Sequence, residues 1–143
     1  MSVAANAGQA PRNAVDVRSE FSFKGEEYCL VATLDLDWML ERRIDPDSLH
    51  QWLAQEHGID TYSYLFEVME VDPVVFENPR GLAIRFHDTD GFDFEGYAQA
   101  HQLERVLNAL QHIAAREMAI DDLTQHPRLQ QALLQAYQLG IKA

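Results

Sequence analysis

The chain has 143 residues, a length that suits one domain with its own core. Hydrophobic residues make up 47% of it and charged residues 24%, both close to the averages of globular proteins, so the composition excludes global disorder and fibrous architectures. Acidic residues outnumber basic ones by 23 to 11, the net charge is −12, and Arg42-Arg43 is the only adjacent basic pair, so nucleic-acid binding is disfavoured. With one cysteine, Cys29, and no apolar run of transmembrane length, we expect a soluble cytoplasmic protein with no nucleic-acid or membrane partner.

The amino-terminal segment, residues 1–15, is expected to be a flexible tail. It opens with a stretch rich in Ala, Asn, Gly and Gln that has no apolar periodicity. Such a stretch offers little apolar surface to offset the conformational entropy lost on ordering. We expect residues 16–143 to form a single α+β domain.

The first predicted element of the domain is a β-hairpin that turns at Gly25. After the turn, every second residue is apolar, at Tyr28, Leu30, Ala32 and Leu34. This period of two is typical of a strand with one buried face.

Residues 38–43 are interpreted as a short helical turn or an irregular connector. A clear helix start follows, because Asp45 is able to cap free amides and Pro46 fits the first helical position. The helix is predicted to run to about His57, since Gly58 supplies the left-handed conformation that commonly ends a helix.

Three further strands are predicted in the middle of the chain. Residues 62–69 alternate and are rich in aromatic and apolar side chains, which favours a strand. Asn78-Pro79-Arg80-Gly81 has the chemistry of a tight turn and precedes a predicted strand over residues 82–86. Residues 88–91 indicate another turn, and Phe92, Phe94 and Tyr97 are the alternating positions of a final strand.

Two helices are predicted at the carboxyl-terminal end. From about Ala98 apolar residues recur at helical spacing, Asp121 and Asp122 interrupt the pattern, and a closing helix follows Pro127 with Gly140 past its end. The predicted order is β-β-α-β-β-β-α-α. This order describes an α+β fold in which an antiparallel meander sheet of about five strands has helices packed on it.

The acidic turn is the sharpest candidate for a metal site. His87, Asp88, Asp90 and Asp93 offer oxygen and nitrogen ligands close together in the sequence. The EF-hand spacing is absent, because counting from Asp88 puts Gly91 fourth rather than sixth. We therefore favour a structural turn and predict no cofactor.

Strand alternation predicts a second apolar face on the sheet, opposite the principal core. We interpret its centre as a surface for a protein partner or for a second copy of the chain, with Val31, Leu65, Met69 and Arg85 as the binding residues. The alternative is a helix that covers this face and makes the same residues ordinary core.

No catalytic motif is present, so an enzyme is not the expected class. The sequence predicts a small acidic interaction or regulatory protein that binds a protein partner or self-associates. Two alternatives remain open: a metal-dependent or small-molecule-binding protein that uses the acidic turn, and an acidic inhibitor of a basic target.

Overall fold

The computed structural model describes residues 10–142. The chain divides into two compact units, residues 1–97 and residues 98–143, and each is described by itself. Residues 1–9, which belong to the expected tail, lie outside the described residues, and the first strand already begins at Ala14. The fold class is α+β, as predicted, but the sheet differs from a five-stranded meander.

The predicted hairpin is confirmed. Strand β1 (Ala14–Phe23) pairs antiparallel with β2 (Glu26–Asp35), and the register is regular from end to end. Lys24 and Gly25 form the turn with φ angles of 52° and 80°. Two consecutive positive φ angles define the type I′ turn, whose twist matches that of the two strands.

The third strand of this sheet, β3 (Val75–Arg80), corrects the predicted turn at residues 78–81. It pairs antiparallel with β1, so the sheet order is β2-β1-β3, and the register shifts between Ala14 and Asp16. Asn78 has a φ of 53° at this irregularity. The turn-forming residues therefore make a bulge within an edge strand. Pro79 has no backbone N–H to donate, and an edge strand tolerates this because no further strand needs that hydrogen bond.

A buried carboxylate fixes this bulge. Asp16 accepts hydrogen bonds from Thr33 Oγ1 at 2.8 Å and Asn78 Nδ2 at 3.0 Å, and Arg80 Nη1 lies 3.0 Å from its Oδ1. Burial by itself raises the pKa of Asp16, but the hydrogen bonds from Asn78, Thr33 and Arg80 outweigh it and hold the pKa below its ordinary value. The ionised carboxylate thus connects all three strands.

Two short helices and a turn follow the hairpin. Helix α1 (Leu36–Glu41) occupies the segment interpreted as a helical turn or connector, and the Asp35 side chain caps it. The helix predicted from Asp45 is confirmed as a 3₁₀ turn, η1 (Pro46–Ser48), continued by α2 (Leu49–Glu56). Asp45 accepts from the Asp47 amide at 2.9 Å, and Gly58 has the expected positive φ of 72°.

The strand predicted over residues 62–69 is wrong, because this segment forms helix α3 (Tyr64–Met69). The Ser63 hydroxyl caps it by accepting from the Phe66 amide at 3.2 Å. Phe66 and Met69, three residues apart, are both buried against the sheet, which is the spacing of a helix face. Local capping and burial therefore override the strand propensity of the aromatic residues.

The last two predicted strands are also largely replaced. Residues 82–86 lie in a 3₁₀ helix, η2 (Gly81–Phe86), because Gly81 turns the chain with a φ of 68° and the Asn13 side chain accepts from the Leu82 amide. A two-residue ladder, β4 (His87–Asp88) with β5 (Gly91–Phe92), forms a separate small sheet. Phe94 already belongs to the next helix.

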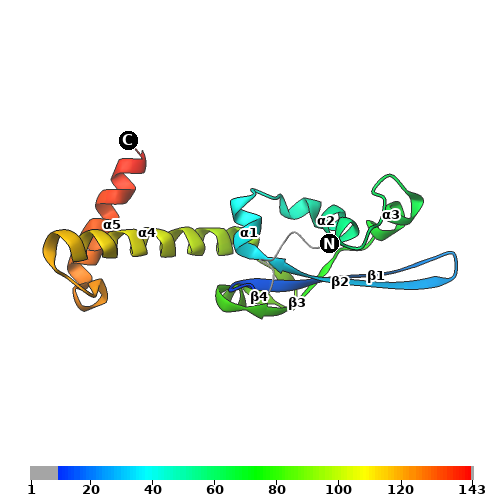
Figure 1. Ribbon diagram of the computed structural model, residues 1–143, viewed down its shortest axis with the longest axis horizontal. Helices are drawn as coiled ribbons and strands as arrows, with labels where there is room; N and C mark the ends of the chain where they lie inside the picture. The colour runs from blue at the N-terminus through cyan, green and yellow to red at the C-terminus, as the bar shows by residue number, and fades with distance from the viewer. Residues whose placement is uncertain (1–9, 143) are drawn as a thin grey trace. The chain divides into compact units, whose positions relative to one another are not determined.

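The helices α1, α2 and α3 lie over one face of the three-stranded sheet (Figure 1). This face carries Val15, Val17 and Phe21 of β1, paired with the even-numbered residues of β2. The other face of the hairpin is mostly polar, because the central strand contributes Asp16, Arg18 and Glu20 there, of which Asp16 is buried and Arg18 half-buried. The exposed side chains of this face are Glu20, Ser22, Glu27, Cys29, Val31 and Thr33.

The carboxyl-terminal unit is a helical hairpin. Helix α4 (Phe94–Met118) begins in the first unit and continues through the second, a 3₁₀ turn η3 (Leu123–Gln125) reverses the chain, and α5 (Pro127–Lys142) follows. Both predicted helices are therefore confirmed, with the interruption at residues 121–122. Gly140 lies inside α5 rather than past its end.

Candidate functional site

The residues predicted to bind a partner do not share one face of a sheet. Val31 lies on β2 with 42% of its surface exposed, whereas Met69 is fully buried in the core and Leu65 packs against that core from α3. Arg85 is exposed on η2. The predicted surface needed residues 62–69 and 82–86 to be strands, and its geometry is lost with them.

The acidic turn is built from hydrogen bonds to the backbone. Asp88 accepts from the Asp90 and Gly91 amides at 2.8 and 3.0 Å, and Asp93 accepts from the Gly96 amide at 3.0 Å at the start of α4. The His87 ring is bonded through Nε2 to the Phe76 carbonyl. Within residues 10–142, no group of three or more His, Cys, Asp or Glu side chains is arranged to hold a metal ion.

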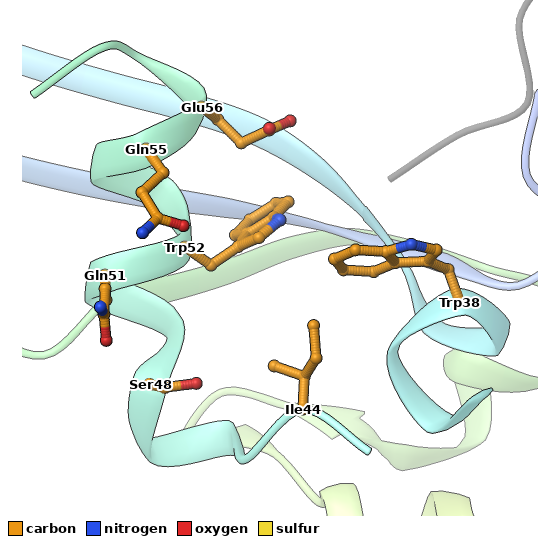
Figure 2. Close-up of a pocket in the computed structure, with 7 residues that line it drawn as sticks. All are labelled: Trp38, Ile44, Ser48, Gln51, Trp52, Gln55 and Glu56. Atoms are coloured by element: carbon orange, nitrogen blue, oxygen red, sulfur yellow. The ribbon is translucent and has the colours of Figure 1, made fainter. Parts of the chain in front are cut away.

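A cavity in the first unit lies between α1 and α2. Its volume is about 470 Å³, within the usual range of ligand pockets. In Figure 2, Trp38 from α1 and Trp52 from α2 lie on either side of the space, and Ile44 points into it from the connecting segment. The rest of the wall is polar and comes from η1 and one face of α2: Ser48, Gln51, Gln55 and Glu56.

Local structure explains why these side chains meet. Residues 48, 51, 52, 55 and 56 recur at helical spacing and therefore share one side of η1 and α2. Asp35 caps α1 through the amides of Asp37 and Trp38, which fixes the start of the helix that carries the first indole. The Arg42 guanidinium lies 5.9 Å from the Trp38 ring centre and packs on it.

Both indole N–H groups at this cavity are buried, and neither has a hydrogen-bond partner within the described part of the chain. A buried donor without an acceptor destabilises a protein by about 1–3 kcal/mol. Native folds seldom keep two such donors beside one cavity without a reason. Both nitrogens are inaccessible to solvent in this conformation, so a ligand in the cavity does not reach them.

The electrostatic surroundings favour a cationic or neutral occupant. Residues 1–97 contain 19 of the 23 acidic residues and 7 of the 11 basic ones, so the first unit holds the whole net charge of −12. No Lys or Arg lines the cavity, whereas the carboxylate of Glu56 does. The net charge of this unit repels an anionic ligand, and the basic side chain that lies beside the wall, Arg42, is packed on the Trp38 ring.

Sequence reasoning missed this site. Trp52 belongs to the helix predicted from Asp45, but Trp38 lies in a segment without a clear sequence pattern. The available signal was that both tryptophans of the chain fall within 15 residues, on either side of a helix start.

Among the described residues, no helix is both long enough and apolar enough to cross a membrane. Comparison of the chain with protein-family models, with curated proteins and with solved structures found no match.

Proposed function

We propose that this protein is an interaction protein that binds an extended segment of a basic partner protein in the Trp38–Trp52 cavity. The observation that carries the proposal is the cavity itself, walled by two indoles and devoid of basic side chains, in a unit with a large acidic excess. Tryptophan is the residue type most enriched at the energetic centres of protein interfaces.

The chemistry of the wall fits a peptide. An apolar side chain of the segment, such as proline, packs between the indoles and Ile44. The amides of Gln51 and Gln55 offer both donors and acceptors to a main chain. Arginine or lysine residues beside the anchor are attracted by the net negative charge of the first unit and by Glu56 in the wall.

The metal-dependent alternative is not carried forward, because Asp88 and Asp93 already accept backbone amides. The sheet-face proposal is not carried forward either, because Met69 lies in the core. Of the functions predicted from the sequence, binding of a basic protein partner is the one that the cavity and its charge support.

The two indole N–H resonances of the protein provide the test, because the chain has only two tryptophans and both line the cavity. The probe is a blocked peptide with a Pro-Pro core and an arginine on each side, titrated into ¹⁵N-labelled full-length protein. Both indole resonances are expected to shift, and the dissociation constant is expected to rise with salt. A peptide with glutamates in place of the arginines should bind at least about tenfold more weakly.

Gln55→Lys introduces a positive charge into the wall and should weaken the arginine peptide by about 1 kcal/mol or more, by repulsion across a few ångströms. Gln102→Lys is the matched control, because Gln102 is an exposed glutamine of α4 that does not line the cavity. Equal weakening by both variants, or indole resonances that stay unmoved at millimolar peptide, would show that the cavity does not bind such a segment.

A further inference from the structure

Strand β2 is an edge of the three-stranded sheet, and among the described strands only β1 pairs with it. It is ten residues long, its register with β1 is regular from end to end, and it contains neither a proline nor a bulge. The opposite edge strand, β3, is six residues long and has both Pro79 and the bulge at Asn78. Short length, proline and bulges protect an edge from pairing with another chain, and β2 has none of these three features.

One contact identifies the backbone groups that β2 directs away from the sheet. The carbonyl of Val31 is bonded at 3.0 Å to Nε2 of His57, the residue that follows α2. In an antiparallel pair, the N–H and C=O of one residue either both bond to the partner strand or both face away, and the two orientations alternate along the strand. The outward residues of β2 are therefore Glu27, Cys29, Val31 and Thr33, and the even-numbered residues bond to β1.

The outward groups of β2 are open to solvent. All four residues are exposed, and within residues 10–142 the bond from His57 is the only hydrogen bond outside the sheet that their amides and carbonyls make. The ring N–H of His57 thus takes the place of an amide of a further strand. An open edge of this kind is a template to which an extended segment of another protein adds by main-chain hydrogen bonds.

The polar face beside this edge carries an excess of negative charge. The register places Glu27 diagonally beside Glu20. Arg18 on the same face has ion pairs with both Glu20 and Glu77, so three carboxylates face one guanidinium, and Lys24 in the turn packs over the ring of the residue before it. Basic side chains of an added strand would be attracted here, whereas a second copy of β2 would bring the same carboxylates and be repelled.

The core face beside this edge is apolar. Here β2 presents Tyr28 and Ala32, which pack against the core, with Leu30 buried between them. Tyr28 stacks on Phe21 of β1 at 4.9 Å between the ring centres. Because side chains alternate between the two faces of a sheet, a strand that fits both sides of this edge alternates basic with apolar residues.

We propose that the outer edge of β2 binds an extended segment of a partner protein as a fourth strand, in which basic residues alternate with apolar ones. The main chain of the segment bonds to the outward groups of Cys29 and Val31, and the carbonyl of Val31 exchanges the His57 ring for an amide of the segment. The basic side chains lie on the polar face, beside the carboxylates. This surface is not the cavity between α1 and α2, and the proposal does not depend on what that cavity binds.

Amide hydrogen exchange of the ¹⁵N-labelled full-length protein, followed by NMR, tests this proposal with a blocked hexapeptide of alternating arginine and valine. The amides of Cys29 and Val31 face solvent, and the peptide is expected to slow their exchange by at least about tenfold. The amides of Leu30 and Ala32 already bond to β1 and should change little. This alternation indicates an added strand, because a peptide held by side chains alone would not distinguish neighbouring amides.

Cys29→Pro removes one outward N–H donor and is expected to weaken binding of the peptide by at least about tenfold. The sheet should tolerate this change, because residue 29 makes no ladder bond to β1 and edge strands accommodate proline. Cys29→Ala is the matched control, since it keeps the N–H and should bind the peptide like the wild type. Equal binding by Cys29→Pro and Cys29→Ala would refute main-chain pairing at this edge.

Peptides with N-methylated amides test the same pairing if Cys29→Pro lowers the strand content measured by circular dichroism. Methylation of every second residue should abolish the slowed exchange in one of the two possible patterns and preserve it in the other, because an added strand bonds through alternate residues. Loss of protection with both patterns, or with neither, would contradict an added strand.

Two further results would overturn the choice of partner. A peptide with glutamates in place of the arginines should bind at least about tenfold more weakly, and equal binding would refute the role of charge. Protection of the Cys29 and Val31 amides that increases with protein concentration in the absence of peptide would assign the edge to a second copy of the chain. The two indole resonances report on the cavity and the alternate amides of β2 report on the edge, so the two proposals can fail separately.

Discussion

Removal of the Asp16 carboxylate is expected to destabilise the first unit, and the loss should depend on pH. Asp16→Ala leaves Thr33, Asn78 and Arg80 without the acceptor that they share. A hydrogen bond to a charged group contributes about 1.5–3 kcal/mol. Because 43% of the Arg80 side chain is exposed and can be rehydrated, the total loss at pH 7 should be about 2–3 kcal/mol, rather than the sum of all three bonds.

The sign of the pH dependence follows from the pKa of Asp16, which folding lowers below its ordinary 3.8. The ionised form is therefore favoured in the folded state. Its contribution is fully present above about pH 5 and is lost as the pH falls through the unfolded pKa and then the lower folded pKa. The difference in unfolding free energy between wild type and Asp16→Ala should shrink accordingly below about pH 4.

Urea unfolding followed by tryptophan emission at several pH values measures this difference, because both tryptophans lie in the first unit. Asp121→Ala is the control. Asp121 is an exposed aspartate outside the sheet, and its removal should change stability by less than about 0.5 kcal/mol. A loss for Asp16→Ala that is the same at pH 3 and pH 7 would refute the assignment of the effect to the carboxylate charge.

Three further substitutions test the turns. Gly81→Ala should lower the free energy of unfolding, measured by urea unfolding, by at least about 2 kcal/mol. Gly81 has a φ of 68°, and an added Cβ would collide with the Asn13 side chain and the Arg12 carbonyl. An unchanged free energy of unfolding would contradict this backbone conformation. Asp90→Asn and Asp93→Asn should each change stability by no more than about 1 kcal/mol, and calcium should not raise the melting temperature. Stabilisation of the wild type by millimolar calcium that both variants lose would restore the metal-site hypothesis.

The correctly predicted elements are those whose signals are local. The Lys24-Gly25 turn, the Asp45-Pro46 helix start and the apolar stripe of α4 each depend on residues close together in the chain, and they form as predicted. The failures concern segments in which local preferences conflict. Aromatic residues favour a strand over 62–69, whereas the Ser63 cap and the buried pair Phe66 and Met69 select a helix.

The bulge in β3 shows why a turn sequence was misread. Asn78 has the positive φ of a turn residue, but this segment pairs with β1, which is more than 50 residues away in the sequence, and is therefore part of a strand. The Asp16 side chain stabilises that pairing through Asn78 and Arg80. No window of sequence around residue 78 contains this partner.

The sequence by itself determined the α+β class, the hairpin, the helix from Asp45, the long amphipathic helix and the acidic excess, because propensity, periodicity and charge are properties of neighbouring residues or of composition. Only the tertiary structure decided that Trp38 and Trp52 line one cavity and that Met69 lies in the core rather than on the surface. It also decided that the apolar residues near the end of α5 are exposed, whereas those near its start pack against α4. These features depend on the packing of elements against one another. Packing is set by contacts between residues that are distant in the chain, and a single sequence does not display those contacts.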